Sequence, residues 1–315
     1  MPSYSGVWTL PAQYQAVGLG LWPSFPVGLF AGGTSSSAIT NVIDFVNISN
    51  AGNASSFGSL TASTRGSAGC GSTTRGLIAL GDTSGSYGSV SSIQYVTFST
   101  KSNATTFGNL TQARCFLAGC NSNTLGVFGG GTTDGSVNSS VIDYITMATT
   151  GNATSFGSLT VARSFLAACS SPTRGVWAGG NPAGGANIVD YITIATTGNA
   201  TSFGNLYLAG DNISGCASSV RGVFGGNNNQ GNVIQYITIA TTGNASLFGY
   251  LTASKSLGAF ACSSNTRGLF AGGTGDNNSI DYVTIDTTGN ATSFGQLTVG
   301  RAWAGGCSNA SGGVQ

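Results

Sequence analysis

The sequence predicts an all-β fold, a six-bladed β-propeller with four short strands in each blade. The first observation is a tyrosine or phenylalanine that is followed twelve residues later by a Phe-Gly pair, six times in the chain. Successive copies begin 45 to 50 residues apart, which is the length of one propeller blade. The second observation is a cysteine at one fixed position of each copy. The aromatic residues are Phe45, Tyr95, Tyr144, Tyr191, Tyr236 and Tyr282, and their partners are Phe57, Phe107, Phe156, Phe203, Phe248 and Phe294.

A representative copy, from Arg174 to Cys216, contains four strand signals. An apolar run closes on a diglycine, and after a loop the strand Asn187–Ile194 carries apolar residues on both faces. A Gly-Asn turn leads into a short outer strand with Phe203, and the chain then continues into an inner strand. Because one inserted residue would turn every later side chain to the other face, the constant spacing of twelve indicates a hairpin of fixed register.

The order of the strands predicts how the ring closes. The last copy is followed by Ala302–Cys307, an inner strand with no blade of its own after it. We expect this strand to pair with Gly28–Ala31 in the first blade, because closure hides two sheet edges that would otherwise invite aggregation. Residues 25–315 then form the propeller, and residues 1–24 form an irregular N-terminal docking segment.

The repeated cysteines are predicted to be small buried hydrophobic residues on the inner strands. Equivalent positions of neighbouring blades point the same way and lie too far apart for a disulfide. A metal-binding ring is the alternative, but the Cys-x-x-Cys and Cys/His pairings of zinc sites do not occur, so we expect no metal site. Cys115 falls outside the pattern and is expected to be a free thiol. The cysteines of the pattern are Cys70, Cys120, Cys169, Cys216, Cys262 and Cys307.

These features resemble the kelch family over nearly all of the chain beyond residue 27. The resemblance includes the tyrosine of the strand after the diglycine and the basic residue before the inner strand, while the kelch tryptophan is replaced by the Phe of Phe-Gly. The near-verbatim Tyr-Ile-Thr-Ile-Ala-Thr-Thr-Gly-Asn-Ala-Thr-Ser-Phe-Gly copies also resemble kelch-type repeats of bacteriophage tail and virion-surface proteins. That likeness implies a structural protein. The diglycines are Gly32-Gly33, Gly129-Gly130, Gly179-Gly180, Gly225-Gly226 and Gly272-Gly273, with Leu80-Gly81 in the second blade.

The residue types narrow the function further. Charged residues make up 6% of the chain, the net charge is +1, and there is no histidine. Without histidine the chain has no Ser-His or Cys-His nucleophile pair and cannot build the copper site of the galactose-oxidase branch of kelch-like propellers. The acids outside the repeat are scattered over different blades, which leaves no carboxylate pair for a glycosidase. We therefore expect a non-enzymatic protein without a cofactor, which binds neither nucleic acid nor anionic lipid.

Neither a secretory signal nor a membrane span is visible. Met1–Gln13 lacks a basic region and a continuous apolar core. Ala16–Gly33 is apolar, but Pro23, Pro26 and five glycines interrupt it, so strands are expected there and no insertion into a membrane. A polar, almost uncharged surface suits a virion surface or another extracellular location.

Charged and amide residues also follow the repeat. Asp44, Asp143, Asp190 and Asp281 precede the aromatic residue, and the basic residues precede two strands of each blade. We expect structural pairs, with an anion-binding ring at the channel mouth as the alternative. The repeated Asn-Ala-Thr and Asn-Ala-Ser sequences match the glycosylation sequon, but the geometry of a Gly-Asn turn explains them. The turn asparagines are Asn53, Asn103, Asn152, Asn199, Asn244 and Asn290.

The length of the repeat varies almost entirely in one loop, between the diglycine and the next aromatic residue, where the spacing runs from 9 to 14 residues. Equivalent loops lie on one face of a propeller, so this face is where the blades differ. Its Asn, Ser, Thr, Gly and Asp residues suit recognition of sugar hydroxyls, although exposed loops also simply tolerate insertions. The candidate binding residues are Ser35, Ser36, Asp82, Ser86, Thr133, Asp134, Asn138, Asn181, Asn187, Asn227, Asn228, Asn229, Asp276 and Asn277.

Together these observations predict a non-enzymatic display protein of a virion, such as a tail fibre or capsid decoration, or of another extracellular assembly. It would bind host-surface carbohydrate or a partner protein through the variable loops, and other structural proteins of the particle through residues 1–24. Multiple copies would strengthen weak binding sites by avidity. The alternatives are a purely structural decoration protein without a ligand and, less in keeping with the residues, a propeller hydrolase.

Overall fold

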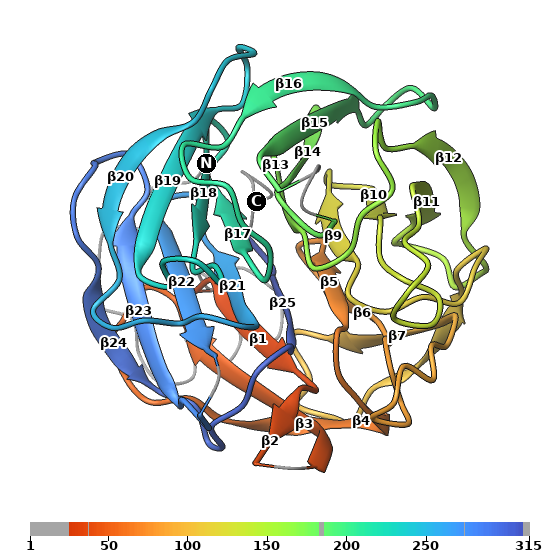
Figure 1. Ribbon diagram of the computed structural model, residues 1–315. Coiled ribbons are helices and arrows are strands. Elements are labelled where there is room, and N and C mark those ends of the chain that lie inside the picture. The colour runs from red at the N-terminus through yellow and green to blue at the C-terminus, as the bar shows by residue number, and fades with distance from the viewer. Residues whose placement is uncertain (1–24, 37, 183–185, 274, 311–315) are drawn as a thin grey trace, which may run out of the picture.

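The computed structural model describes residues 25–36, 38–182, 186–273 and 275–310 (Figure 1). Six antiparallel sheets stand around a central axis, and every helix-or-strand element in these residues is a β-strand. The predicted all-β, six-bladed propeller is therefore confirmed. The docking segment expected at residues 1–24 lies outside the described residues. Within the described ranges, no helix is long and apolar enough to cross a membrane.

Each blade has its first strand nearest the axis. Blade 1 consists of β25 (Gly305–Ser308), β1 (Val27–Ala31), β3 (Ala38–Asn47) and β4 (Ser55–Thr64), with the short β2 (Thr34–Ser35) beside β3. Blade 2 consists of β5 (Ala68–Gly71), β6 (Arg75–Ala79), β7 (Ser92–Thr97) and β8 (Thr105–Asn109). Blade 3 consists of β9 (Ala118–Asn121), β10 (Leu125–Gly129), β11 (Val141–Thr146) and β12 (Thr154–Ser158).

The remaining three blades repeat this order. Blade 4 consists of β13 (Ala167–Ser170), β14 (Arg174–Ala178), β15 (Ile188–Thr193) and β16 (Thr201–Asn205). Blade 5 consists of β17 (Ser214–Ala217), β18 (Arg221–Gly225), β19 (Val233–Thr238) and β20 (Ser246–Tyr250). Blade 6 consists of β21 (Ala259–Ser263), β22 (Arg267–Gly272), β23 (Ser279–Thr284) and β24 (Thr292–Gln296).

The ring is closed by β25, which pairs with β1 from Gly28 opposite Ser308 to Ala31 opposite Gly305. In Figure 1 the two strands lie side by side near the centre, and β25 also contacts β21 and β5, the inner strands on either side. The predicted closure is confirmed, although the strand begins at Gly305 rather than Ala302. The reason is Trp303, whose φ of 57° lies in the left-handed region and interrupts an extended strand.

The spacing of twelve reflects a hairpin with one irregularity. In blade 4, the rings of Tyr191 and Phe203 meet edge to face with centroids 5.8 Å apart. Between them the register shifts by a bulge at Val189 and Asp190. The other five blades show the same ring contact and the same bulge. The hairpin register is thus fixed as predicted, but the bulge is an additional feature.

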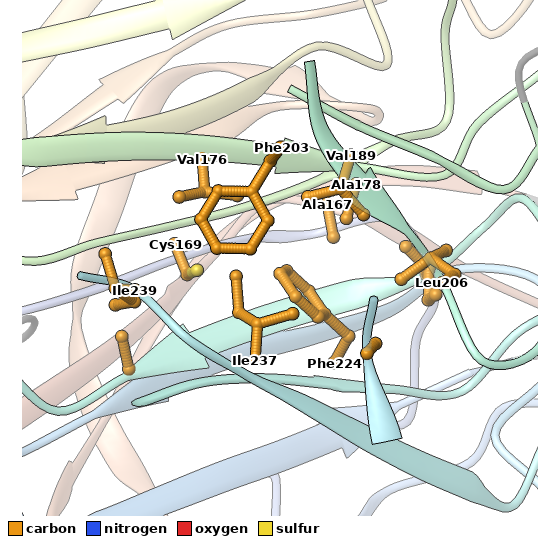
Figure 2. Packing of buried hydrophobic residues seen from close by; sticks show 13 residues of the cluster. Ala167, Cys169, Val176, Ala178, Val189, Phe203, Leu206, Phe224, Ile237 and Ile239 are labelled. Carbon is orange, nitrogen blue, oxygen red and sulfur yellow. The ribbon is translucent and has the colours of Figure 1, made fainter. Parts of the chain in front are cut away.

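The hydrophobic core lies between neighbouring blades. Figure 2 shows the cluster between blades 4 and 5, where Val176, Val189 and Phe203 of one blade face Phe224 and Ile237 of the next. Burial of a side chain of this size stabilises the fold by about 1.5–3 kcal/mol. Because each blade supplies only one side of such a cluster, the blades stabilise one another.

The six repeated cysteines are buried and free, and each packs against a glycine of the next blade. A Cβ added to Gly126, for example, would lie 2.6 Å from the Sγ of Cys70. Burial raises the pKa of the Cys70 thiol well above its ordinary value, which favours the neutral form. The prediction of small hydrophobic residues is confirmed. Cys115 is also buried and free.

The sequon asparagines do more than form a turn, because each also binds the preceding blade. Asn199, in the outer hairpin of blade 4, accepts a hydrogen bond at its Oδ1 from the N–H of Ser158 in blade 3, at 3.1 Å. The glycine of Phe-Gly permits this approach, since a Cβ on Gly157 would lie 2.2 Å from the carbonyl oxygen of Gly198. Equivalent bonds of 3.0–3.1 Å occur at Asn53, Asn103, Asn152, Asn244 and Asn290.

Candidate functional site

The repeated charges form buried structural pairs. Arg114 bonds Asp143 at 2.7 Å, and both side chains are fully buried. Burial lowers the pKa of Arg114, and the charge of Asp143 opposes that shift. The predicted pairing is therefore observed, and these charges lie inside the blades rather than around an open anion site. The equivalent pairs are Arg163–Asp190 at 3.0 Å, Arg301–Asp44 at 2.8 Å and Lys255–Asp281 at 4.0 Å.

The ring has two different faces. At the mouth face, the connectors that follow each outer strand, such as residues 110–117, enter the inner strands, and the variable loops return to this end. At the turn face, the tight turns after the inner strands and the outer hairpin loops are found. All of the candidate binding residues therefore lie at the mouth face, where the sequence predicted a common surface.

The candidate residues differ in exposure. Asp82 and Asn227 are fully buried and do not face solvent. Ser35, Thr133, Asn138 and Asn277 are half-buried. The exposed candidates are Ser36, Ser86, Asp134, Asn181, Asn187, Asn228, Asn229 and Asp276.

Several of the Asp and Asn side chains shape their own loops. Asp82 accepts hydrogen bonds from the backbone N–H groups of Ser84, Gly85, Tyr87 and Gly88 and from Arg65. Burial alone would raise the pKa of Asp82, but these bonds outweigh burial and lower the pKa to about 2. Asp134, Asn227 and Asn277 bond backbone N–H groups two or three residues ahead in the same way. These oxygens are used to order the loops.

We expect the Asp82 loop to lose stability in acid. A pKa that is lower in the folded than in the unfolded chain stabilises the fold above pH 4, and this stabilisation disappears as the pH falls toward 2. The contribution is about 2 kcal/mol. Urea unfolding at pH 5 and pH 2.5 measures it: the loss of stability on acidification should be smaller by about this amount in Asp82→Asn than in the wild type. Equal losses in the two proteins would contradict the assignment.

Neighbouring loops also bond one another, so the rim is continuous at two junctions. The Oγ of Ser36 in blade 1 donates to Asp276 of blade 6 at 2.7 Å. The Nδ2 of Asn138 in blade 3 donates to the carbonyl oxygen of Asn181 in blade 4 at 3.0 Å. The first bond joins the first and last blades on the mouth face, where β25 closes the ring below them.

At the centre of the mouth face, six equivalent residues form a structure that we call the collar. Each precedes the cysteine of its blade by four residues and has a positive φ, between 54° and 97°. Five backbone hydrogen bonds of 2.7–2.9 Å connect them around the axis, each from the N–H of one collar residue to the carbonyl oxygen of the previous one. The collar residues are Gly66, Phe116, Phe165, Asn212, Gly258 and Trp303.

Three collar residues are aromatic, although the left-handed conformation costs such residues about 1–2 kcal/mol each. Phe116 stacks on Phe165 with ring centroids 4.1 Å apart, and its edge meets Trp303 at 6.2 Å. Trp303 extends over Gly258, and its Nε1 donates to the Oδ1 of Asn212 at 2.9 Å. Glycine or asparagine would fit this backbone with less strain, so large rings are held here against the backbone preference.

Two residues outside the collar extend the aromatic surface. Tyr87, from the variable loop of blade 2, is 38% exposed and lies 5.8 Å from the ring of Phe116. The guanidinium of Arg65 lies 5.5–5.9 Å from the rings of Tyr87, Phe116 and Trp303, and it is paired with Asp82. The charges at the collar therefore neutralise each other, and the surface is aromatic with little net charge.

The collar surrounds a hollow of about 610 Å³, counting the space open to solvent. Phe116, Phe165, Asn212 and Trp303 line it, with backbone and small residues of the inner strands below. A hollow with aromatic walls and a few polar groups is the usual form of a small-ligand site. In the described ranges, no three Asp or Cys side chains come together as a metal site would require.

The sequence analysis missed the collar aromatics because they do not repeat. At the same position three copies carry Gly66, Asn212 and Gly258, which are the residues that favour a positive φ. That preference was the available signal, since it marks Phe116 and Trp303 as residues in an unfavourable backbone position.

The class of the protein follows from its architecture: a six-bladed β-propeller with four-stranded blades and an aromatic collar at one end of the channel. The chain matches no protein-family model and no curated protein.

Proposed function

We propose that this chain is a non-enzymatic display protein, of the kelch-like type seen in bacteriophage tail and virion-surface proteins, that binds neutral glycans at its collar. The observation that carries the proposal is the strained aromatic cluster of Phe116, Phe165 and Trp303 at the channel mouth. Strain of this kind concentrates at functional sites.

The chemistry of the mouth face favours a sugar ring as the ligand. A pyranose has an apolar face that packs on an aromatic ring and hydroxyl groups along its edge. Tyr87 and Trp303 provide partly exposed rings, and amides such as Asn212 and Asn228 surround them. The pairing of Arg65 with Asp82 leaves little unbalanced charge to select an ionic ligand. A neutral glycan fits these groups better than a charged one.

In this proposal the protein is exposed on a virion or another extracellular assembly and is held there by residues 1–24. Several copies per particle would let modest single-site affinity suffice. The second candidate, a purely structural decoration protein, is favoured by the hydrogen bonds that order the loops internally, such as those of Asp82. It predicts no glycan binding at all.

We expect Trp303→Asn to weaken glycan binding about tenfold or more, because it removes a central aromatic contact. Asparagine is the residue of blade 5 at the same collar position, so the backbone accepts it. The measurement is a glycan array followed by titration of the strongest oligosaccharide. Tyr250→Ala is the control, since Tyr250 is 43% exposed on the outer strand β20. Equal loss in the two variants, or an array without signal, would contradict the proposal.

A further inference from the structure

The turn face carries arginines that fasten one blade to the next. The Nη1 of Arg174 in blade 4 donates to the carbonyl oxygens of Ile239 and Ala240 in blade 5, at 3.0 and 2.8 Å. The same guanidinium lies 4.7 Å from the centre of the Tyr191 ring. We call this combination, an aromatic face and two carbonyl oxygens of the next blade, an arginine socket. Arg75 and Arg267 make the same contacts, and Arg221 makes them with the carbonyl oxygen of Ile285 alone.

Two blades lack an arginine at this position. In blade 1 the residue is Val27, but a cation still covers the aromatic ring, because Nζ of Lys101 from blade 2 lies 3.9 Å from the centre of Phe45. In blade 3 the residue is Leu125, which packs beside Tyr144. Of the six repeated aromatics in the described residues, Tyr144 is the one without a cation on its ring.

The junction between blades 3 and 4 therefore contains a socket without its arginine. A hollow of about 540 Å³, counting the space open to solvent, lies there against Leu125, Pro172, Ile194 and Ala195. Ile194 and Ala195 are the counterparts of the two residues whose carbonyl oxygens receive Arg174. The same backbone that binds a guanidinium between blades 4 and 5 is thus open between blades 3 and 4.

We propose that this socket accepts an arginine side chain of a partner protein. A guanidinium presents several N–H donors in a plane, which suits two adjacent carbonyl oxygens, as the three complete sockets of the chain show. The site lies on the turn face, away from the collar. The proposal does not depend on what the collar binds.

The partner is a protein other than a second copy of this chain. The chain contains ten lysine and arginine residues, and each is engaged in the folded protein. Four arginines fill sockets, Lys101 covers Phe45, and the remaining cations pair with aspartates. Residues 1–24 contain no basic residue. A copy of the chain could offer an arginine only by giving up one of these contacts.

The test is an NMR titration of the full chain with N-acetyl-arginine methylamide. We expect saturable shifts of the backbone amides of Leu125, Ile194 and Ala195, with affinity in the millimolar range. The citrulline analogue, which replaces the guanidinium by a neutral urea, should produce much smaller shifts. Leu125→Arg should abolish the response, because the new side chain fills the socket from within.

Arg174→Leu provides the gain-of-site control, since leucine is the natural residue at this position of blade 3. It should open a second socket and add shifts at Ile239 and Ala240. Absence of shifts at the blade 3–4 junction, equal shifts with the citrulline analogue, or an unchanged response in Leu125→Arg would each overturn the proposal. Because Leu125→Arg adds a staple and removes none, that arm holds even if Arg174→Leu folds poorly.

Discussion

Asp143→Asn should lower the free energy of unfolding by about 3–5 kcal/mol, because it leaves the charge of Arg114 buried without its counter-ion. Both side chains are fully buried and 2.7 Å apart. Arg114 also donates to the carbonyl oxygens of Val141 and Phe128, so it cannot turn toward water without breaking these bonds. Equilibrium unfolding in urea measures the change.

The chain itself contains a neutral version of this pair, which provides the control. In blade 2, Thr64 and Gln94 occupy the positions of Arg114 and Asp143, and Gln94 bonds residues of the same connector. The double variant Arg114→Thr with Asp143→Gln should therefore recover more than half of the stability that Asp143→Asn loses. A double variant as unstable as the single one would show that the buried charge is not the cause.

Removal of residues 305–315 should abolish cooperative folding, because it takes away β25 and opens the ring. The inner strands β21 and β5 would lose the strand between them, and β1 would lose its partner. Exposed edges of this kind lead to association between chains. The cost exceeds a typical total stability of about 5–15 kcal/mol when the core between blades is lost as well. Gel filtration and thermal unfolding followed by circular dichroism measure it.

A peptide of residues 301–310 supplied in trans provides the matching rescue. It contains β25 and also Arg301, whose side chain bonds Asp44 of blade 1 at 2.8 Å. Strand addition of this kind can restore a sheet from outside. We expect the peptide to restore a monomer with a cooperative transition. A truncated chain that is monomeric and melts at the wild-type temperature would contradict closure by β25.

The scaffold could be predicted because it repeats. The spacing between Tyr191 and Phe203 appears in six copies and fixes one hairpin register, so a single blade predicts the others. The bulge at Asp190 could not be predicted, since a constant spacing is equally compatible with a regular hairpin. The bond from Asn199 to Ser158 was also missed, because a sequence places a turn without showing which neighbouring strand it touches.

The candidate site was harder to predict, since its residues are the ones that depart from the repeat. The position of the variable loops was predicted correctly, but polar residues such as Asp82 and Asn227 proved to be internal supports of those loops. Phe116 and Trp303 come together only because the ring brings blades 1 and 3 around one axis. Distances across a channel are not encoded in local spacing.

The most direct test of the central claim is the structure of the intact protein bound to the oligosaccharide that a glycan screen ranks first. The account predicts one sugar ring packed against Tyr87, Phe116 or Trp303 at the collar, with its hydroxyls bonded to amides of the surrounding loops. A sugar bound on the turn face or the outer strands, with the collar unoccupied, would contradict it.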